Sequence, residues 1–122
     1  MELTKQVTSR ELSEKLKKLG VPQKSVFSWY IPVFNGDMVF KFARVDTEKI
    51  DNDDIKWCSA FTVAELGKIL PKDFHLSMYR TISGGWGFDI DKVEQTVKYA
   101  DTEAECRGLM LLYLLENKLI TL

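Results

Sequence analysis

The spacing of apolar residues and a repeated start signal predict three helices in this chain. Each start combines a Thr with a Glu three positions later: Thr8 with Glu11, Thr62 with Glu65, and Thr102 with Glu105. In such a capping box, the Thr hydroxyl and the Glu carboxylate bind the otherwise unpaired amides at the start of a helix. We therefore expect helices that begin near residues 9, 63 and 103.

The first predicted helix has a narrow apolar stripe and ends at a glycine. Leu12, Leu16 and Leu19 recur at helical spacing. Gly20 readily adopts the left-handed conformation that follows a helix end, and Pro22 cannot continue a helix. The second predicted helix is short and stops before residue 71, which is also a proline.

The third predicted helix is apolar on nearly every side. Between residues 106 and 115 the only charged side chain is Arg107, so this helix needs cover on more than one face. The leucine stripe of the first helix would provide part of that cover. Alternatively, a partner or a second copy of the chain would pack on Met110 and Leu114. The first interpretation is favoured, because burying apolar area stabilises a fold by about 25 cal/mol per Å².

Between the helices, apolar and polar residues alternate, which is typical of strands. Asn35-Gly36 is a strong signal for a two-residue hairpin turn. That turn predicts these pairs: Trp29 with Phe42, Tyr30 with Lys41, and Ser28 with Ala43. Pro32 in the first strand indicates a sheet edge or a bulge, because proline cannot donate a hydrogen bond to a neighbouring strand.

The glycine-rich stretch at residues 81–87 predicts the corner of a second hairpin. A three-residue loop, Ser83-Gly84-Gly85, places Gly85 at the left-handed position. It predicts these pairs: Ile82 with Trp86, Arg80 with Phe88, and Met78 with Ile90. The apolar residues then share one face, with Arg80 as the only misfit. A phosphate-binding loop would instead lead into a helix, whereas residues 86–91 alternate as a strand.

These elements predict a single α+β domain over residues 1–122. A fifth strand is expected at residues 95–100, and residues 46–56 are expected to form an acidic connection. The economical arrangement is an antiparallel sheet of about five strands, made of two hairpins and one further strand, with three helices packed on one face.

Composition limits the class of protein. Hydrophobic residues make up 45% and charged residues 29% of the 122 residues, which is ordinary for a soluble globular domain. No apolar run is long enough to cross a membrane, and no secretory leader pattern is present. Two cysteines, Cys58 and Cys106, are too few for a disulfide framework. We expect reduced thiols, a cytoplasmic location and no membrane contact.

The charge is small overall but unevenly distributed. The net charge is −1, yet residues 1–45 carry eight Lys or Arg against four acidic residues, and residues 46–122 carry nine against fourteen. A nucleic-acid-binding protein would use the cations of the first helix: Arg10, Lys15, Lys17 and Lys18. Glu11 and Glu14 share that helix, and no aromatic stacking set accompanies the cations. A solvated helix face is the favoured interpretation.

Residues with catalytic or metal-binding chemistry do not form a complete motif. The acidic run at residues 51–54 lacks the glycine and the closing glutamate of an EF-hand loop. The outer face of the second hairpin would carry a set of polar residues: His75, Ser77, Tyr79, Asp89 and Asp91. A sheet face does not by itself supply the oxyanion hole that a serine nucleophile needs. We expect no metal, no cofactor and no enzymatic activity.

Two stretches resemble segments of small proteins of tailed phages and prophages of gut bacteria. They are SAFTVAELGKILP at residues 59–71 and ADTEAECRGLMLLYLLENKLI at residues 100–120. Members of that group share a T-x-x-E-L…LP segment and an A-D-T-x-A-E helix that closes on L-L-E-N-K-L-I. The resemblance implies a cytoplasmic protein made during phage growth or carried in a prophage. The group has no assigned activity, so no catalytic residues are carried over.

The sequence therefore predicts a phage- or prophage-related, non-enzymatic protein that acts through contacts with a protein partner or with a second copy of itself. The expected contact residues are aromatic and cationic side chains of the two hairpins, the types enriched at interfaces: Tyr30, Lys41, Arg44 and Tyr79. The alternative function is a nucleic-acid-binding accessory protein that uses the cations of the first helix.

Overall fold

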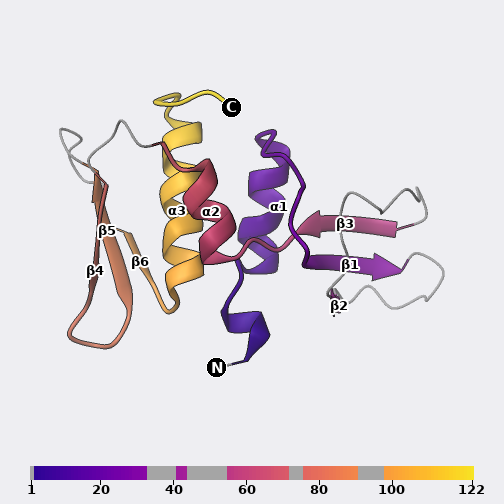
Figure 1. Cartoon of the computed structure of the whole chain (residues 1–122), viewed down its shortest axis with the longest axis horizontal. Coiled ribbons are helices and arrows are strands. Elements are labelled where there is room, and N and C mark those ends of the chain that lie inside the picture. The colour runs from indigo at the N-terminus through magenta and orange to yellow at the C-terminus, as the bar shows by residue number, and fades with distance from the viewer. Residues whose placement is uncertain (1, 33–40, 44–54, 72–75, 91–97) are drawn as a thin grey trace.

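The computed structural model describes residues 2–32, 41–43, 55–71, 76–90 and 98–122. Three helices lie between two small antiparallel sheets (Figure 1). The elements in chain order are η1 (Leu3–Lys5), α1 (Arg10–Lys18), β1 (Ser28–Pro32), β2 (Lys41–Ala43), β3 (Ile55–Ser59), α2 (Val63–Ile69), β4 (Leu76–Arg80), β5 (Trp86–Ile90), β6 (Lys98–Ala100) and α3 (Glu103–Glu116). The α+β class and the three helices are confirmed, whereas the single five-stranded sheet with helices on one face is wrong.

The first sheet has the strand order β2-β1-β3 and confirms the predicted pairing of the first hairpin. The pairs are Trp29 with Phe42, Tyr30 with Lys41, and Ser28 with Ala43. The predicted turn at residues 35 and 36 lies outside the described residues. Strand β3, which begins inside the expected acidic connection, pairs with the other side of β1. Strand β1 is central, so its expected position at a sheet edge is wrong. The alternative, a bulge, is not seen where β1 pairs with β3, because that pairing is regular as far as Pro32, the last residue of the strand.

The second sheet has the order β4-β5-β6, and its register differs from the predicted one by two residues. Arg80 pairs with Trp86, and Met78 pairs with Phe88. Because side chains alternate along a strand, a shift of two residues leaves each side chain on its predicted face. The turn differs more from the prediction. Ile82, expected to pair with Trp86, lies fully exposed at the tip of the hairpin, and the left-handed residue is Gly84, with a φ of 91°, where Gly85 was predicted. The additional strand is confirmed as β6, over the described end of its predicted range.

Helix α1 begins one residue later than predicted. Ser9 is the N-cap, and its hydroxyl accepts a hydrogen bond from the Leu12 amide. Glu11 is exposed and does not close the predicted capping box. Thr8 is instead fully buried. Its amide donates to the Phe61 carbonyl at 2.9 Å, and its hydroxyl accepts from the Phe61 amide at 3.0 Å. Thr8 thus joins the start of α1 to the segment before α2.

The end of α1 agrees with the prediction. Gly20 has a φ of 90°, and the Val21 amide donates to the Leu16 carbonyl at 3.1 Å, a pattern that closes many helices. Leu12 and Leu16 are buried, but Leu19 is 39% exposed. Only the first two leucines of the stripe therefore contribute fully to the core.

Helix α2 begins with the predicted capping box. The Thr62 hydroxyl accepts from the Glu65 amide, and the Glu65 carboxylate accepts from the Thr62 amide. The same carboxylate also accepts the Ser25 hydroxyl at 2.8 Å and the Val26 amide at 3.3 Å. Glu65 therefore ties the segment before β1 to the start of α2.

Helix α3 begins at the predicted Thr102, but its glutamate binds a different helix. The Thr102 hydroxyl accepts from the Glu105 amide at 3.1 Å. The two Glu105 carboxylate oxygens accept the Ser9 amide at 2.8 Å and the Ser9 hydroxyl at 2.7 Å. The Glu105 carboxylate thus accepts the N-cap hydrogen bonds of α1 in place of the predicted Glu11. We call this contact the Glu105–Ser9 clasp.

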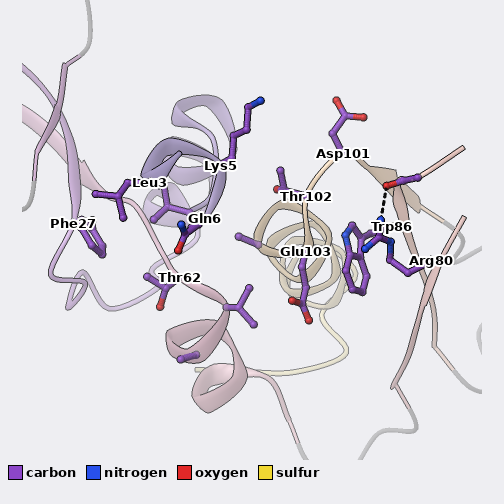
Figure 2. A pocket seen from close by; sticks show the side chains of 15 residues that line it. Leu3, Lys5, Gln6, Phe27, Thr62, Arg80, Trp86, Asp101, Thr102 and Glu103 are labelled. Carbon is purple, nitrogen blue, oxygen red and sulfur yellow. Dashed lines mark hydrogen bonds between the residues drawn. The ribbon is translucent and has the colours of Figure 1, made fainter. Parts of the chain in front are cut away.

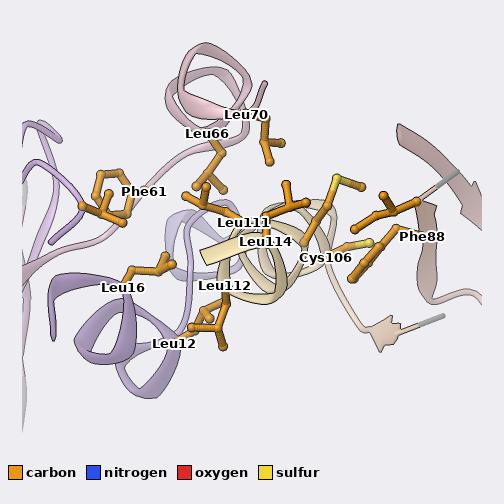
Figure 3. Packing of buried hydrophobic residues seen from close by; sticks show 13 residues of the cluster. Leu12, Leu16, Phe61, Leu66, Leu70, Phe88, Cys106, Leu111, Leu112 and Leu114 are labelled. Atoms are coloured by element: carbon orange, nitrogen blue, oxygen red, sulfur yellow. The ribbon is translucent and has the colours of Figure 1, made fainter. Parts of the chain in front are cut away.

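Helix α3 lies in the middle of the fold and is covered by elements of the same chain. It packs against α1, α2, β5 and β6, and Figure 3 shows the leucines of α1 and α2 gathered around it. Cover by the first helix is thereby confirmed. Met110 and Leu114 are 1% and 0% exposed, so the interpretation of these residues as a partner surface is wrong. At Gly108 an added Cβ would lie 2.6 Å from Leu12 Cδ2 and 2.8 Å from Thr8 Cγ2, which shows how closely α1 approaches.

We predict that Glu105→Ala lowers the free energy of unfolding by about 2 kcal/mol, because it leaves the Ser9 amide and hydroxyl without their charged acceptor. Glu11→Ala is the matched control in the first turn of α1, and it should cost about 0.5 kcal/mol or less because its side chain is exposed. Urea denaturation of both variants measures the difference. An equal or larger loss for Glu11→Ala would contradict the clasp.

Candidate functional site

A groove of about 560 Å³ opens where η1, the starts of α2 and α3, and the β4–β5 hairpin meet (Figure 2). Its size lies within the range of ligand pockets, about 300 to 1,000 Å³. The apolar part of its lining consists of Leu3, Val7, Phe27, Val63, Ala64 and Trp86. The charged residues around it are Lys5, Arg80, Asp101 and Glu103. This combination makes the groove the candidate functional site.

The position of the groove follows from how the helix starts are held together. Figure 1 shows that the three helices begin at the same end of their layer. Val7 forms an antiparallel bridge with Thr62, which places η1 beside the start of α2. The Glu105–Ser9 clasp brings the start of α3 to the same point. Segments that are distant in the sequence therefore form one groove with fixed walls.

One end of the groove is apolar and supported by stacked rings. Phe27 lines the groove and stacks on Phe42 with 5.5 Å between ring centroids. The Phe42 ring in turn lies 5.2 Å from the Trp29 ring. Trp29 Nε1 donates to the Thr8 carbonyl at 3.0 Å. The first sheet is thus fixed to the start of α1, and this fixes the apolar end of the groove.

The opposite end of the groove is formed by Arg80 and Trp86. These residues are cross-strand partners, and the Arg80 guanidinium lies 4.9 Å from the centre of the Trp86 ring. One of its nitrogens donates to the Gly84 carbonyl at 3.3 Å. Arg80 was expected only as a misfit among apolar residues on its face of the sheet. This charged residue on an apolar face is the one sign of the groove that the sequence contains. The other lining residues come from segments that are distant in the sequence, so no local pattern connects them.

The remaining charges around the groove differ in their pairing. Glu103 forms an ion pair with Arg107 at 3.2 Å within α3. Asp101, which precedes α3, is exposed, and so is Lys5 of η1. The groove therefore has one neutralised carboxylate, one exposed carboxylate and two exposed cations on its rim.

The outer face of the second sheet carries a pair of tyrosines, of which Tyr79 was a predicted contact residue. Tyr79 of β4 and Tyr99 of β6 lie on either side of Gly87 in β5. The Tyr79 ring covers the glycine so closely that a Cβ there would lie 2.6 Å from Tyr79 Cζ. Partial burial, with the hydrogen bond and charge of Tyr99, raises the pKa of Tyr79 above its ordinary value. Tyr99, which sequence reasoning did not single out, is 66% exposed.

The other predicted contact residues do not gather around Tyr79. Tyr30 is half-buried in β1, and its cross-strand partner is Lys41 of β2. Arg44 lies outside the described residues. The helix layer separates the sheet of Tyr30 from the sheet of Tyr79 (Figure 1). These two tyrosines therefore lie in different sheets, on opposite sides of the helix layer.

The cations proposed for nucleic-acid binding have different surroundings. Arg10 pairs with a carboxylate one helical turn later, at 3.3 Å. Lys17 Nζ lies 4.1 Å from the centre of the Trp57 ring and donates to the Trp57 carbonyl. Lys15 and Lys18 are exposed. Because affinity for a polyanion grows with the number of phosphates neutralised, two engaged cations out of four weaken the case for this surface.

The residues considered for catalysis or metal binding do not form a site in the described part of the chain. Ser77 and Asp89 are exposed on the outer sheet face, as predicted, whereas residues 51–54, 75 and 91 lie outside the described residues. Among the residues that the structure describes, no group of three or more His, Cys, Asp or Glu could hold a metal ion. Cys58 and Cys106 are buried and form no disulfide.

Comparison of the chain with protein-family models, curated proteins and solved structures found no match. Within the described ranges, no helix is long and apolar enough to span a membrane. The fold and the site together define an α+β protein with a groove of ligand size.

We predict that the protein becomes less stable between pH 9 and pH 11 because of Cys106. Burial raises the pKa of this thiol from its ordinary value of 9.0 to about 11, with a smaller contribution from Glu103 and an opposing one from Arg107. Below pH 9 both states keep the proton. As the pH rises further, the unfolded chain loses it first, so the free energy of unfolding falls.

Urea denaturation over this pH interval measures the slope of the free energy of unfolding. Cys106→Ala should flatten that slope, because it removes the titrating thiol. If the slope is the same in wild type and Cys106→Ala, the thiol does not titrate as described.

Proposed function

We propose that the protein is a non-enzymatic module that binds a segment of a protein partner in the groove. The observation that carries this proposal is a ligand-sized groove with an apolar lining and charged residues on its rim. In such sites the apolar lining provides the area for burial, and a few polar groups set the orientation of the ligand. The resemblance to phage and prophage proteins supports a role during phage growth or in a prophage.

A short stretch of polypeptide suits the layout of the groove. Figure 2 shows Leu3 and Phe27 on one side of the start of α3, and Arg80 and Trp86 on the other. A ligand that reaches both ends needs an apolar group at one end and a polar group at the other. An extended peptide offers two such side chains at a fixed spacing along its backbone.

The walls of the groove are already fixed before a partner arrives. The bridge between Val7 and Thr62, the clasp of Glu105 on Ser9, and the complete capping box of α2 hold three of its segments. A pre-organised site loses less conformational entropy on binding than a mobile one. This supports a binding function for the groove without a large conformational change.

We predict that Ala64→Tyr abolishes capture of the groove's partner. Ala64 is exposed at the start of α2 and lines the groove, so the larger side chain fills the groove without entering the core. Gly67→Tyr is the matched control, because it adds the same side chain to α2 where an added Cβ meets nothing within 4 Å. Tagged wild type and both variants are used to capture proteins from lysate, with and without nuclease and at low and high salt.

A protein captured in stoichiometric amounts by wild type and Gly67→Tyr, but not by Ala64→Tyr, supports the groove as the binding site. Equal capture by all three places the contact elsewhere on the molecule. Capture that disappears with nuclease contradicts a protein partner and favours nucleic acid, with Lys15 and Lys18 as the cations to test next.

A further inference from the structure

We propose that the groove selects a partner segment in which an acidic side chain lies near an apolar one, and that Arg80 binds the carboxylate. This inference rests on the proposed function of the groove and adds the chemistry of the ligand. The occupant is an extended peptide whose Asp or Glu side chain reaches Arg80 while its apolar side chain packs at the end formed by Leu3 and Phe27.

Arg80 is held in one orientation by contacts within its own hairpin. Its guanidinium lies over the Trp86 ring at 4.9 Å, and one nitrogen donates to the Gly84 carbonyl at 3.3 Å. A guanidinium has five N–H donors in a planar fork that matches a carboxylate. Among the described residues, Arg80 forms no ion pair with a carboxylate. The stacked fork is therefore held in place with donors available for a ligand.

Arg80 also interrupts the apolar face of its strand. It lies on the same face of β4 as Met78, opposite Trp86 and next to the buried Phe88. A cation on the core-facing side of a sheet breaks the hydrophobic pattern, and such departures are expected mainly at functional sites. In this protein, the interruption of the apolar face by Arg80 places a positive charge at the rim of the groove.

The charges around the groove are unequally paired. Lys5 adds a second exposed cation from η1. The carboxylate of Glu103 is already paired with Arg107 at 3.2 Å, and only Asp101 opposes the two cations. The remaining charge favours an anionic ligand. Charge complementarity of this kind speeds encounter and selects among partners.

The experiment starts with a library of short random peptides selected on the immobilised full-length protein. Wild type, Ala64→Tyr and Arg80→Gln are screened in parallel, with Lys18→Gln as a control for the loss of one positive charge outside the groove. We expect wild type and Lys18→Gln to enrich peptides that combine an Asp or Glu with an aliphatic or aromatic residue. Arg80→Gln should lose the preference for the acid.

The affinity of an enriched peptide is then measured by calorimetry as a double-mutant cycle. Arg80→Gln, or the exchange of the peptide's acid for its amide, should each weaken binding about tenfold or more, because either change removes a charge-assisted hydrogen bond. The two changes together should cost little more than either alone. Arg80→Lys keeps the charge but loses the fork, and it should restore only part of the affinity.

The outcomes separate this inference from the proposed function. If no selected peptide depends on Ala64, the groove is not a peptide site and both proposals fail. If peptides depend on Ala64 but carry no acid, or if the two changes of the cycle are additive, the groove binds peptides and the role of Arg80 is overturned. Thermal unfolding shows whether each variant is folded before its binding is measured.

Discussion

A helix that is apolar on every side must be covered on every side, and this constraint organises the whole protein. Helix α3 satisfies it by packing against α1, α2 and the second sheet, all from the same chain. Met110, Leu111 and Leu114 are fully buried as a result. The first sheet packs on α1 through β3, and Trp29 donates a hydrogen bond to the Thr8 carbonyl just before that helix. The arrangement of the elements around α3 follows from the need to cover all of its apolar faces.

Two glutamates determine where the groove forms. Glu65 and Glu105 each lie in the first turn of a helix and also accept hydrogen bonds from another segment. Buried or half-buried carboxylates that accept several such bonds hold their partners more tightly than neutral groups would. They draw the starts of the helices to one end of the layer, beside η1 and the tip of the β4–β5 hairpin. The groove lies among these segments, so the contacts that stabilise the fold also shape the site.

Local signals predicted local structure well and long-range structure poorly. The starts of α2 and α3 and the end of α1 follow from short-range hydrogen bonds, and the sequence shows them directly. The cap of α1 was misplaced because Ser9 binds a carboxylate 96 residues away, which no local pattern reveals. The division of the strands into two sheets, and the strand β3, were missed for the same reason, because strand order depends on packing across the molecule. The groove was missed except for Arg80, whose break in the hydrophobic pattern was visible.

The most direct test of the enclosure of α3 is the free energy of unfolding of Gly108→Ala, compared with Gly67→Ala. In an open helix position, alanine is more favourable than glycine by about 1 kcal/mol. Gly67→Ala should therefore stabilise the protein, since nothing lies within 4 Å of its added Cβ. Gly108→Ala should destabilise it by about 1 kcal/mol or more, because the new methyl group meets Leu12 and Thr8 of the adjoining α1 segment. A gain in stability at Gly108 would contradict the close packing of α1 on α3.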